Sequence, residues 1–228
     1  PNFVIDIGAN YGFTGIVYGR IFNNAHLTLV EPSKKLCKYI KLNLTQNKIS
    51  KFNIVNSICG EESVRSMSFA INPLSSQDNR VIGETEKWET ITSSVVILSN
   101  LISTSESAFN FIKIDTQGYE ERVFSGGADY LDSSSNWIIK TEFAPYWLNS
   151  QGTDPEDFLK GLVAKYNVCE LPTRSRYKGD NIESLLSNKI QISEVLKACK
   201  HIQKYNKNGR GWCDLLITPK NPSHIIKK

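Results

Sequence analysis

Two apolar segments of the sequence each carry a lysine and a carboxylate two positions apart: Lys113 with Asp115, and Lys140 with Glu142. In a β-strand, residues two apart point to the same face. Ionised groups are costly inside a buried strand unless they are paired. If the two strands are neighbours, Asp115 and Glu142 lie where a carboxylate could accept the proton of a weak nucleophile such as a hydroxyl group. The alternative is an ion-pair cluster that only neutralises the two lysines.

A second group of residues could bind a nucleotide-like cofactor. Gly8 and Gly12 follow an apolar run, and Glu31 comes at the end of the next one. Gly8 lets a ligand approach the backbone, and Gly12 lets a helix pack closely on the strand. A carboxylate at the position of Glu31 can accept hydrogen bonds from both hydroxyls of a ribose. Asn10 replaces the second glycine of the dinucleotide fingerprint, which disfavours a pyrophosphate cofactor such as NAD.

Strand-like runs that alternate with helical patterns place these residues in a doubly wound, mostly parallel α/β sheet. Helices are expected over 11–22, after Ser33 as N-cap, from Tyr119, and from Asp154-Pro155. Residues 60–107 are polar and show no clear period. Strands are expected at 3–7, 26–30, 52–58, 109–115, 137–143, 167–171 and 212–218.

Two motifs resemble the FkbM-like family of methyltransferases that use S-adenosylmethionine (SAM). The first is Asp6-Ile7-Gly8-Ala9-Asn10-Tyr11-Gly12 with Glu31-Pro32-Ser33, and the second is Ile112-Lys113-Ile114-Asp115-Thr116-Gln117-Gly118-Tyr119-Glu120 with Phe124-Ser125-Gly126-Gly127. The resemblance covers roughly residues 3–145. It implies a class I methyltransferase fold with a seven-stranded sheet, and methyl transfer to a hydroxyl of a sugar, glycan or secondary metabolite. Ser99-Asn100 departs from the family, which often has an acidic pair there.

The site residues expected from the motifs and the resemblance fall into three sets. Asp115, Glu142 and Lys113 are expected to be catalytic. Tyr146 and Trp147 are expected to form a wall for the acceptor, and Arg174 and Arg176 suit an anionic or hydroxyl-rich one. Cofactor binding is expected from Asp6, Gly8, Asn10, Tyr11, Gly12, Glu31, Ser33 and Ser57. A divalent metal held by Asp115 and Glu142 is an alternative way to acidify the hydroxyl, but no metal site is expected, because the pair has no third carboxylate or histidine nearby.

The chain is expected to form one domain over residues 1–228. Residues 172–211 are too long for a simple connection, so they predict an insertion with its own helix that covers the acceptor site. The sequence starts directly at the first strand, without the N-terminal helices that usually help to cover the cofactor in the family. We therefore expect either a domain of a larger multidomain or glycan-assembly protein or an unusually open site.

Composition excludes some classes of protein. The 27 basic and 23 acidic side chains leave +4, too small an excess to indicate nucleic-acid binding, and Lys34-Lys35 is interpreted as a solvated face. No apolar run approaches ~20 residues, so no membrane span is expected. Five scattered cysteines indicate reduced thiols and a cytoplasmic location. The alternatives to an enzyme of this family are a degenerate SAM-binding regulatory or scaffold domain and an NAD-dependent oxidoreductase.

Overall fold

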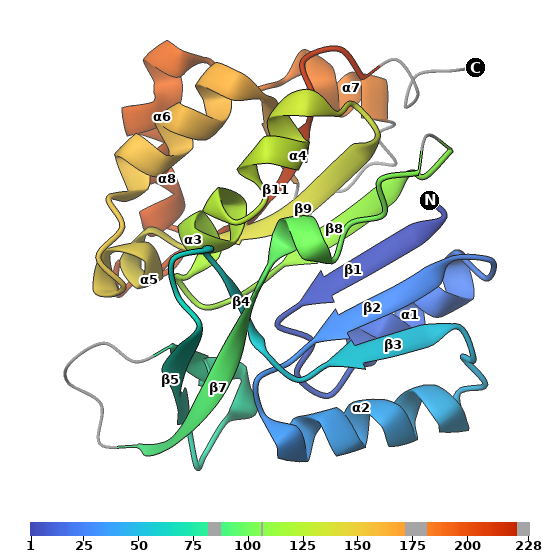
Figure 1. Ribbon diagram of the computed structural model, residues 1–228. Helices are drawn as coiled ribbons and strands as arrows, with labels where there is room; N and C mark the ends of the chain where they lie inside the picture. The colour runs from blue at the N-terminus through green and yellow to red at the C-terminus, as the bar shows by residue number, and fades with distance from the viewer. Residues whose placement is uncertain (82–87, 106, 172–181, 223–228) are drawn as a thin grey trace.

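A seven-stranded sheet, in the order β10-β11-β9-β8-β1-β2-β3, forms the centre of the protein (Figure 1). The computed structural model describes residues 1–81, 88–105, 107–171 and 182–222. All neighbouring strands are parallel except β11, which runs antiparallel to β9 and β10. This topology confirms the doubly wound sheet of the class I methyltransferase fold. The strands are β1 (Phe3–Ile7), β2 (His26–Val30), β3 (Phe52–Val55), β8 (Asn110–Ile114), β9 (Trp137–Phe143), β10 (Asn167–Glu170) and β11 (Cys213–Thr218).

Helices cover the two faces of this sheet, because alternate strand residues point to opposite sides. Val4 packs with α1 (Phe13–Ile21) and α2 (Lys34–Gln46), whereas Ile5 belongs to the larger core on the other face. That second face is covered by α3 (Glu120–Ser125), α4 (Ala128–Ser133), α5 (Pro145–Ser150), α6 (Pro155–Lys165) and α8 (Val195–Gln203), and α7 (Ile182–Ser187) contacts β10.

The two helix caps expected from the sequence are present. The Ser33 hydroxyl accepts a hydrogen bond from the Leu36 N–H at 3.3 Å, and α2 buries Leu36, Ile40 and Leu44. The Asp154 carboxylate accepts from the N–H groups of Glu156 and Asp157, each at 2.9 Å. The first helix is shorter than expected, since it begins at Phe13 after a left-handed residue at Gly12.

The expected strand over 52–58 is wrong, because the chain changes sheets at residues 56–57. β3 ends at Val55, and Ile58 begins β4 (Ile58–Gly60), which pairs with β7 (Glu89–Ile97) in a separate sheet. The Asn56 amide donates to the carbonyl oxygens of Glu31 and Pro32 at 3.0 and 2.7 Å. These bonds hold the chain to the end of β2 while it leaves the main sheet.

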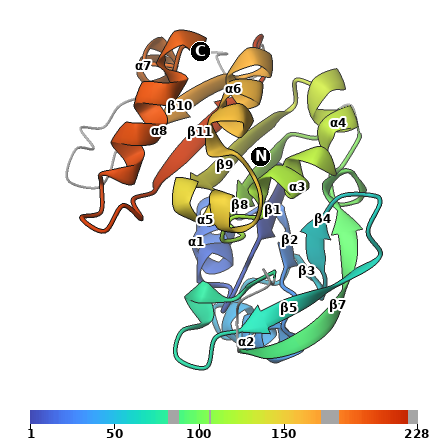
Figure 2. The same ribbon diagram turned by 90° about the vertical axis from the view of Figure 1, so that its left-hand side faces the viewer.

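The polar stretch over 60–107, which showed no clear period in the sequence, supplies three of the four strands of this small sheet. Its order is β4-β7-β5-β6, with β5 (Ser66–Ile71) and β6 (Arg80–Val81). One face buries a cluster made by Ile58, Phe69, Val81 and Tyr119. Figures 1 and 2 show the small sheet beyond the carboxyl ends of β1 and β2, where it can line a ligand site.

The long segment before β11 contains helices, as expected. Val195, Cys199 and Ile202 of α8 lie in the main core, and α8 packs against α5 and α6. The described part of this segment is therefore largely a structural layer on the sheet, and residues 172–181 lie outside the described residues. Across the described chain, no helix combines the length and apolarity that a bilayer crossing requires.

A substitution at Gly126, directly after α3, tests the contact between this helix and the small sheet. A Cβ at Gly126 would overlap the carbonyl oxygen of Gly60 in β4. We expect Gly126→Ala to lower the free energy of unfolding by about 1–3 kcal/mol, since the two elements must move apart. Chemical denaturation measures this change.

The matched control is Gly161→Ala in α6, where an added Cβ meets nothing within 4 Å. This substitution should raise the free energy of unfolding by about 0.5–1 kcal/mol, because alanine favours the helix. An equal effect at both positions would contradict the packing described here.

Candidate active site

The turn between β1 and α1 is held against the end of β2. The N–H groups of Gly8 and Ala9 both donate to the Val30 carbonyl, at 3.1 and 3.0 Å. Gly8, Asn10 and Gly12 adopt left-handed backbone conformations, with φ of 77°, 51° and 77°. A Cβ at Gly8 would also overlap the carbonyl oxygen of Asp115, so only glycine fits between this turn and β8.

Glu31 reaches this turn from the end of β2. Its Oε2 accepts from the Asn10 N–H at 3.0 Å, and its Oε1 accepts from the Ser33 N–H at 2.9 Å. The residue is 4% exposed, and burial raises the pKa of its carboxyl to about 7, although the two N–H groups offset part of the rise. Each oxygen keeps a lone pair for a further donor, as two ribose hydroxyls would require.

A cleft of about 690 Å³ connects Glu31 with the ends of β8 and β9. This volume suits a small-molecule site. Of the residues expected at the site, the cleft is lined by Gly8, Asn10, Tyr11, Glu31, Ser57, Lys113, Asp115, Glu142 and Trp147.

The other expected residues lie outside this lining. Asp6 is buried behind it, Gly12 packs against Ile40, and Ser33 caps α2. Tyr146 lies next to the rim, with its ring 4.8 Å from that of Trp147. Arg174 and Arg176 fall outside the described residues.

Lys113 joins β1 and β8 through a buried ion pair. Its Nζ lies 3.2 Å from Asp6 Oδ1 and 3.4 Å from Asp115 Oδ2, and it donates to the Gly8 carbonyl at 3.2 Å. Burial alone would lower the pKa of Lys113, but the carboxylates of Asp6 and Asp115 more than offset it and raise the pKa. Lys113 therefore stays charged and fixes the backbone of the glycine turn.

Asp115 and Glu142 lie together at the ends of neighbouring strands, as expected. The Gln117 amide donates to both, at 3.0 Å to Asp115 Oδ1 and 3.3 Å to Glu142 Oε2. Burial, with the negative charges of Asp115 and Glu120, raises the pKa of Glu142 well above its ordinary value. Such a group is suited to proton transfer.

Glu142 does not neutralise Lys140. Lys140 pairs instead with Asp214 on β11, at 2.7 Å. Among the ion pairs found between described residues, none includes Glu142. The alternative role, in which the carboxylates only neutralise the two lysines, therefore fits Asp115, which pairs with Lys113. It does not fit Glu142, because Lys140 pairs with Asp214.

Glu120 supports the loop that carries Gln117. Its Oε1 accepts from the N–H and hydroxyl of Thr116, at 2.8 and 3.0 Å, and from the Gly118 N–H at 3.3 Å. Gln117 and Gly118 are both left-handed, with φ of 57° and 100°. The buried carboxylate thus holds the loop, with its left-handed residue Gln117, in a conformation in which Gln117 reaches both acids.

An aromatic wall borders the other side of these acids. Trp147 and Trp212 line the cleft, and Trp212 is 52% exposed. The Arg80 guanidinium lies 4.1 Å from the centre of the Trp147 ring, and that of Arg210 lies 4.3 Å from the Tyr146 ring. Arg210 belongs to the segment that we expected to cover the acceptor site. It lies next to the rim of the cleft, because it contacts the ring of Tyr146, which in turn contacts Trp147.

The small sheet supplies residues that the sequence did not predict for the site. Ser76 in the short 3₁₀ helix η1 (Ser76–Asp78) donates to Asn10 Oδ1 at 3.0 Å. Phe69, Gln77, Asp78 and Asn79 also line the cleft. No local motif marks them, because their place depends on the docking of this sheet. Gln117 lies within one of the two motifs, and Trp212 is the first residue of an expected strand, although β11 itself begins at Cys213.

In the described parts of the chain, no group of three or more His, Cys, Asp or Glu side chains is arranged so that it could hold a metal ion.

Comparison with known proteins matches residues 6–168 to the model of the methyltransferase FkbM domain. This chain belongs to that family. The match spans the glycine turn, Glu31 and the Asp115 motif, so it confirms the expected family and, with it, SAM as the cofactor. No curated protein matches the chain significantly.

Solved structures with a related fold include other methyltransferases. A precorrin-6y C5,15-methyltransferase from Geobacter metallireducens is 12% identical, with a TM-score of 0.45 over 95% of this chain and 80% of its own. A Streptococcus mutans protein assigned to the methyltransferases and solved with S-adenosylhomocysteine is 8% identical, with a TM-score of 0.48 over 96% and 89%. At these values the family assignment depends on the sequence match alone.

The raised pKa of Glu31 predicts how the stability of this FkbM-family protein depends on pH without cofactor. Between pH 4.5 and about 7 the folded state holds a proton on Glu31 that the unfolded state has lost. The free energy of unfolding should therefore fall as pH rises through this window, by at most about 1.4 kcal/mol per pH unit from this group. Denaturation at several pH values measures the slope.

Glu31→Gln removes this titration and should flatten the slope, whatever its effect on stability at one pH. The exposed Glu62→Gln is the control and should keep the wild-type profile. Parallel profiles for wild type and Glu31→Gln would show that Glu31 titrates normally.

Lys113→Met should destabilise the protein by about 3–5 kcal/mol, because it leaves the carboxylate of Asp6 buried without its cation. The double variant with Asp6→Asn should recover much of this loss. Thermal and chemical denaturation give both values.

Lys140→Met is the matched control, since Lys140 and Asp214 have side chains 30% and 31% exposed. Its cost should not exceed about 1 kcal/mol. Equal costs for the two lysines would mean that the pair of Lys113 and Asp6 is not a special constraint.

Proposed function

We propose that the protein transfers a methyl group from SAM to a hydroxyl of a sugar, a glycan or a small metabolite. The observation that carries the proposal is the placement of Asp115 and Glu142 in the same cleft as Glu31, bridged by the Gln117 amide. The cofactor end and the proton-accepting end of the reaction then lie in one continuous space.

The cofactor end is formed by Glu31 and the glycine turn. Glu31 would hold the ribose hydroxyls, and the backbone at Gly8 and Asn10 leaves room for the ligand because no Cβ fills it at Gly8. Tyr11 and Ser57 line the same end. When bound, SAM supplies a methyl group on a positively charged sulfur, which an acceptor oxygen takes as S-adenosylhomocysteine leaves.

The acids provide the proton acceptor. A hydroxyl is a weak nucleophile at neutral pH, and a carboxylate within hydrogen-bond reach that takes its proton contributes roughly 10²- to 10⁴-fold to the rate. Gln117 keeps Asp115 and Glu142 side by side, so that the pair accepts the proton as a unit. Lys113 holds Asp115 from behind the cleft.

The acceptor side is formed by aromatic rings. Trp147 and Trp212 offer flat apolar faces on which the C–H face of a sugar ring can pack. Arg210 at the rim suits an acceptor that carries a phosphate or carboxylate. From the sequence we propose the same preference for Arg174 and Arg176, which lie outside the described residues.

The cysteines support a cytoplasmic location for the protein. All five are free thiols, as expected of a protein that stays in a reducing compartment.

Asp115→Asn keeps the shape of the side chain but removes its negative charge. We expect the single-turnover rate to fall by about 10²-fold or more while SAM still binds, because the proton acceptor is lost. Glu142→Gln should also lower the rate, and the double variant should lose less than the product of the single effects. Rapid-quench assays with radiolabelled SAM, and calorimetry for SAM binding, give the two quantities.

Asp132→Asn is the matched control, because Asp132 pairs with Lys165 and does not line the cleft. Its single-turnover rate should stay near that of the wild type. Normal turnover by Asp115→Asn with a lowered melting temperature would assign that acid a structural role. SAM binding without turnover on any hydroxyl acceptor would favour a regulatory or scaffold domain.

A further inference from the structure

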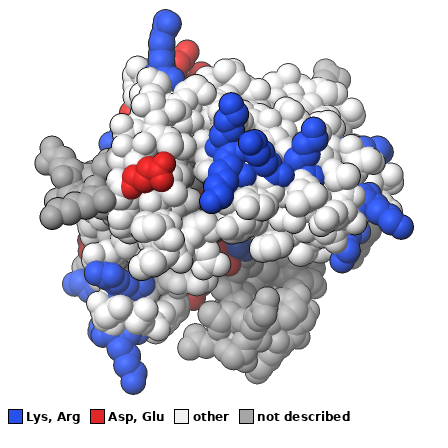
Figure 3. Space-filling view, turned by 90° about the horizontal axis from the view of Figure 1, so that it is seen from below, with Lys and Arg blue, Asp and Glu red and all other residues white. Residues whose placement is uncertain are grey.

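The outer surface of α1 and α2 is strongly basic. Residues 7–60 hold seven of the chain's 27 basic side chains and one of its 23 acidic ones, and that acid is the buried Glu31. We call the seven exposed cations the basic layer: Arg20, Lys34, Lys35, Lys38 and Lys41 on the two helices, and Lys48 and Lys51 in the chain that follows α2. Figure 3 views the molecule from this side and shows a row of Lys and Arg side chains, with one acidic side chain to the left of that row and smaller acidic patches elsewhere, mostly towards the edges.

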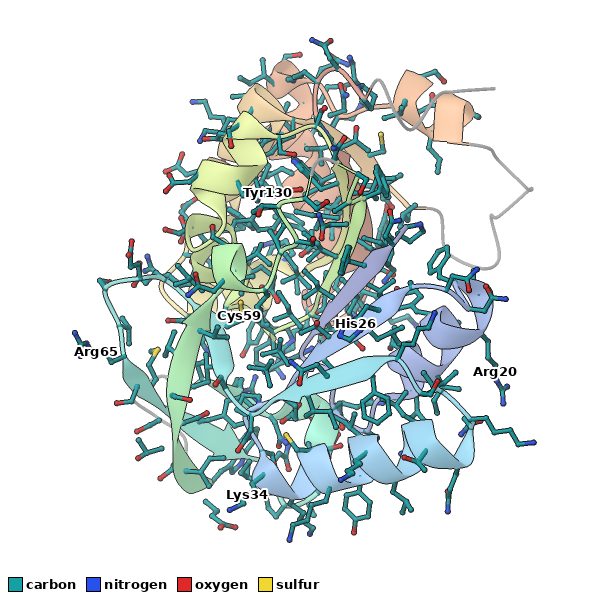
Figure 4. All side chains as sticks on the ribbon, turned by 45° about the vertical axis from the view of Figure 1, so that its right-hand side comes forward. Arg20, His26, Lys34, Cys59, Arg65 and Tyr130 are labelled. Atoms are coloured by element: carbon teal, nitrogen blue, oxygen red, sulfur yellow. The ribbon has the colours of Figure 1, made fainter. Side chains whose placement is uncertain are left out.

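The two helices form one continuous surface. The Arg20 guanidinium donates to Asn47 Oδ1 at 2.7 Å, and the Asn43 amide donates to the Tyr11 carbonyl at 2.9 Å. The rings of Tyr11 and Tyr39 lie 5.5 Å apart. Figure 4 shows Arg20 and Lys34 pointing outward from different ends of this pair of helices.

Large apolar side chains are exposed among these cations. Ten such side chains are exposed in the described residues, and five of them lie on α1 and α2. Phe13, Val17 and Ile21 recur every four residues on α1 and are 65%, 51% and 63% exposed; Tyr39 and Leu42 stand on α2. Exposed apolar side chains that recur on one helix, beside a second helix that carries cations, are typical of a surface that meets both polar and apolar groups.

We propose that this surface binds the face of an anionic lipid bilayer. Lysines near a membrane are attracted by acidic headgroups, and apolar side chains beside them enter the boundary between headgroups and acyl chains. The surface combines both features on two helices that lie side by side. The protein would lie on the surface of the bilayer, with only the exposed apolar side chains of this surface entering the headgroup boundary.

Other partners fit the same surface less well. A second copy of the chain would bring the basic layer against itself, which repulsion disfavours. Nucleic acid would use the cations, but it offers nothing to exposed aliphatic side chains such as Val17, Ile21 and Leu42, and six of the seven cations are lysines rather than arginines.

Co-sedimentation with vesicles tests the proposal. The full chain should bind vesicles that contain roughly one third phosphatidylglycerol and not those of phosphatidylcholine alone, and high salt should weaken the binding. The triple variant Lys34→Glu, Lys38→Glu and Lys41→Glu should bind at least about tenfold more weakly. Val17→Ser with Ile21→Ser should reduce the part of the binding that resists salt.

The control variant carries Lys160→Glu, Lys197→Glu and Lys200→Glu, three exposed changes on α6 and α8 at the opposite face of the sheet. It should bind vesicles as the wild type does. Equal losses in both triple variants would show that net charge alone is responsible and would overturn the proposal, as would absence of vesicle binding or preference for duplex DNA or polyglutamate. Melting curves and S-adenosylhomocysteine binding show that each variant is folded.

Discussion

The ammonium group of Lys113 lies between two carboxylates inside the sheet, and both ends of the cleft depend on it. It contacts Asp6 on β1, Asp115 after β8 and the carbonyl of Gly8. A buried carboxylate such as Asp6 is tolerated only with a cation nearby, and a buried lysine only with anions. The same group therefore ties the glycine turn, which we propose faces the cofactor, to the acid that we propose faces the acceptor. A shift of the glycine turn should therefore move Lys113 and Asp115, and a shift of Asp115 should move the turn.

The distribution of charge around the cleft follows from this constraint. Lys113 supplies a single positive charge next to two carboxylates, Asp6 and Asp115. Asp115, Glu142 and Glu31 all line the cleft, so its lining has more acidic groups than this one lysine can neutralise. Burial raises the pKa values of Glu31 and Glu142, so a ligand that carries positive charge would favour their ionised forms. Binding of a sulfonium cofactor is then linked to release of protons. Glu120 completes the arrangement from behind, since it fixes the loop from which Gln117 bridges the acids.

The parts of this site that the sequence predicted are those encoded locally. The glycine turn, Glu31 at a strand end and the Ser33 cap each depend on residues within a few positions of one another. The parts that it missed depend on contacts between distant segments. Lys140 pairs with Asp214 because β11 inserts antiparallel beside β9, and the strand expected over 52–58 is divided because Asn56 bonds to the end of β2. Ser76 reaches Asn10 only after the small sheet has docked.

The same two helices serve the inside and the outside of the molecule. The turn before α1 presents Asn10 to Glu31, and the opposite surfaces of α1 and α2 carry the basic layer. Tyr11 lines the cleft while its ring contacts Tyr39 on the outer surface, and Phe13 is both exposed and part of the lining. A bilayer held by the basic layer would thus lie beside the mouth of the cleft. An acceptor attached to lipid could then approach Asp115 and Glu142 without leaving the membrane, and the negative cleft and the positive surface would take part in one binding event.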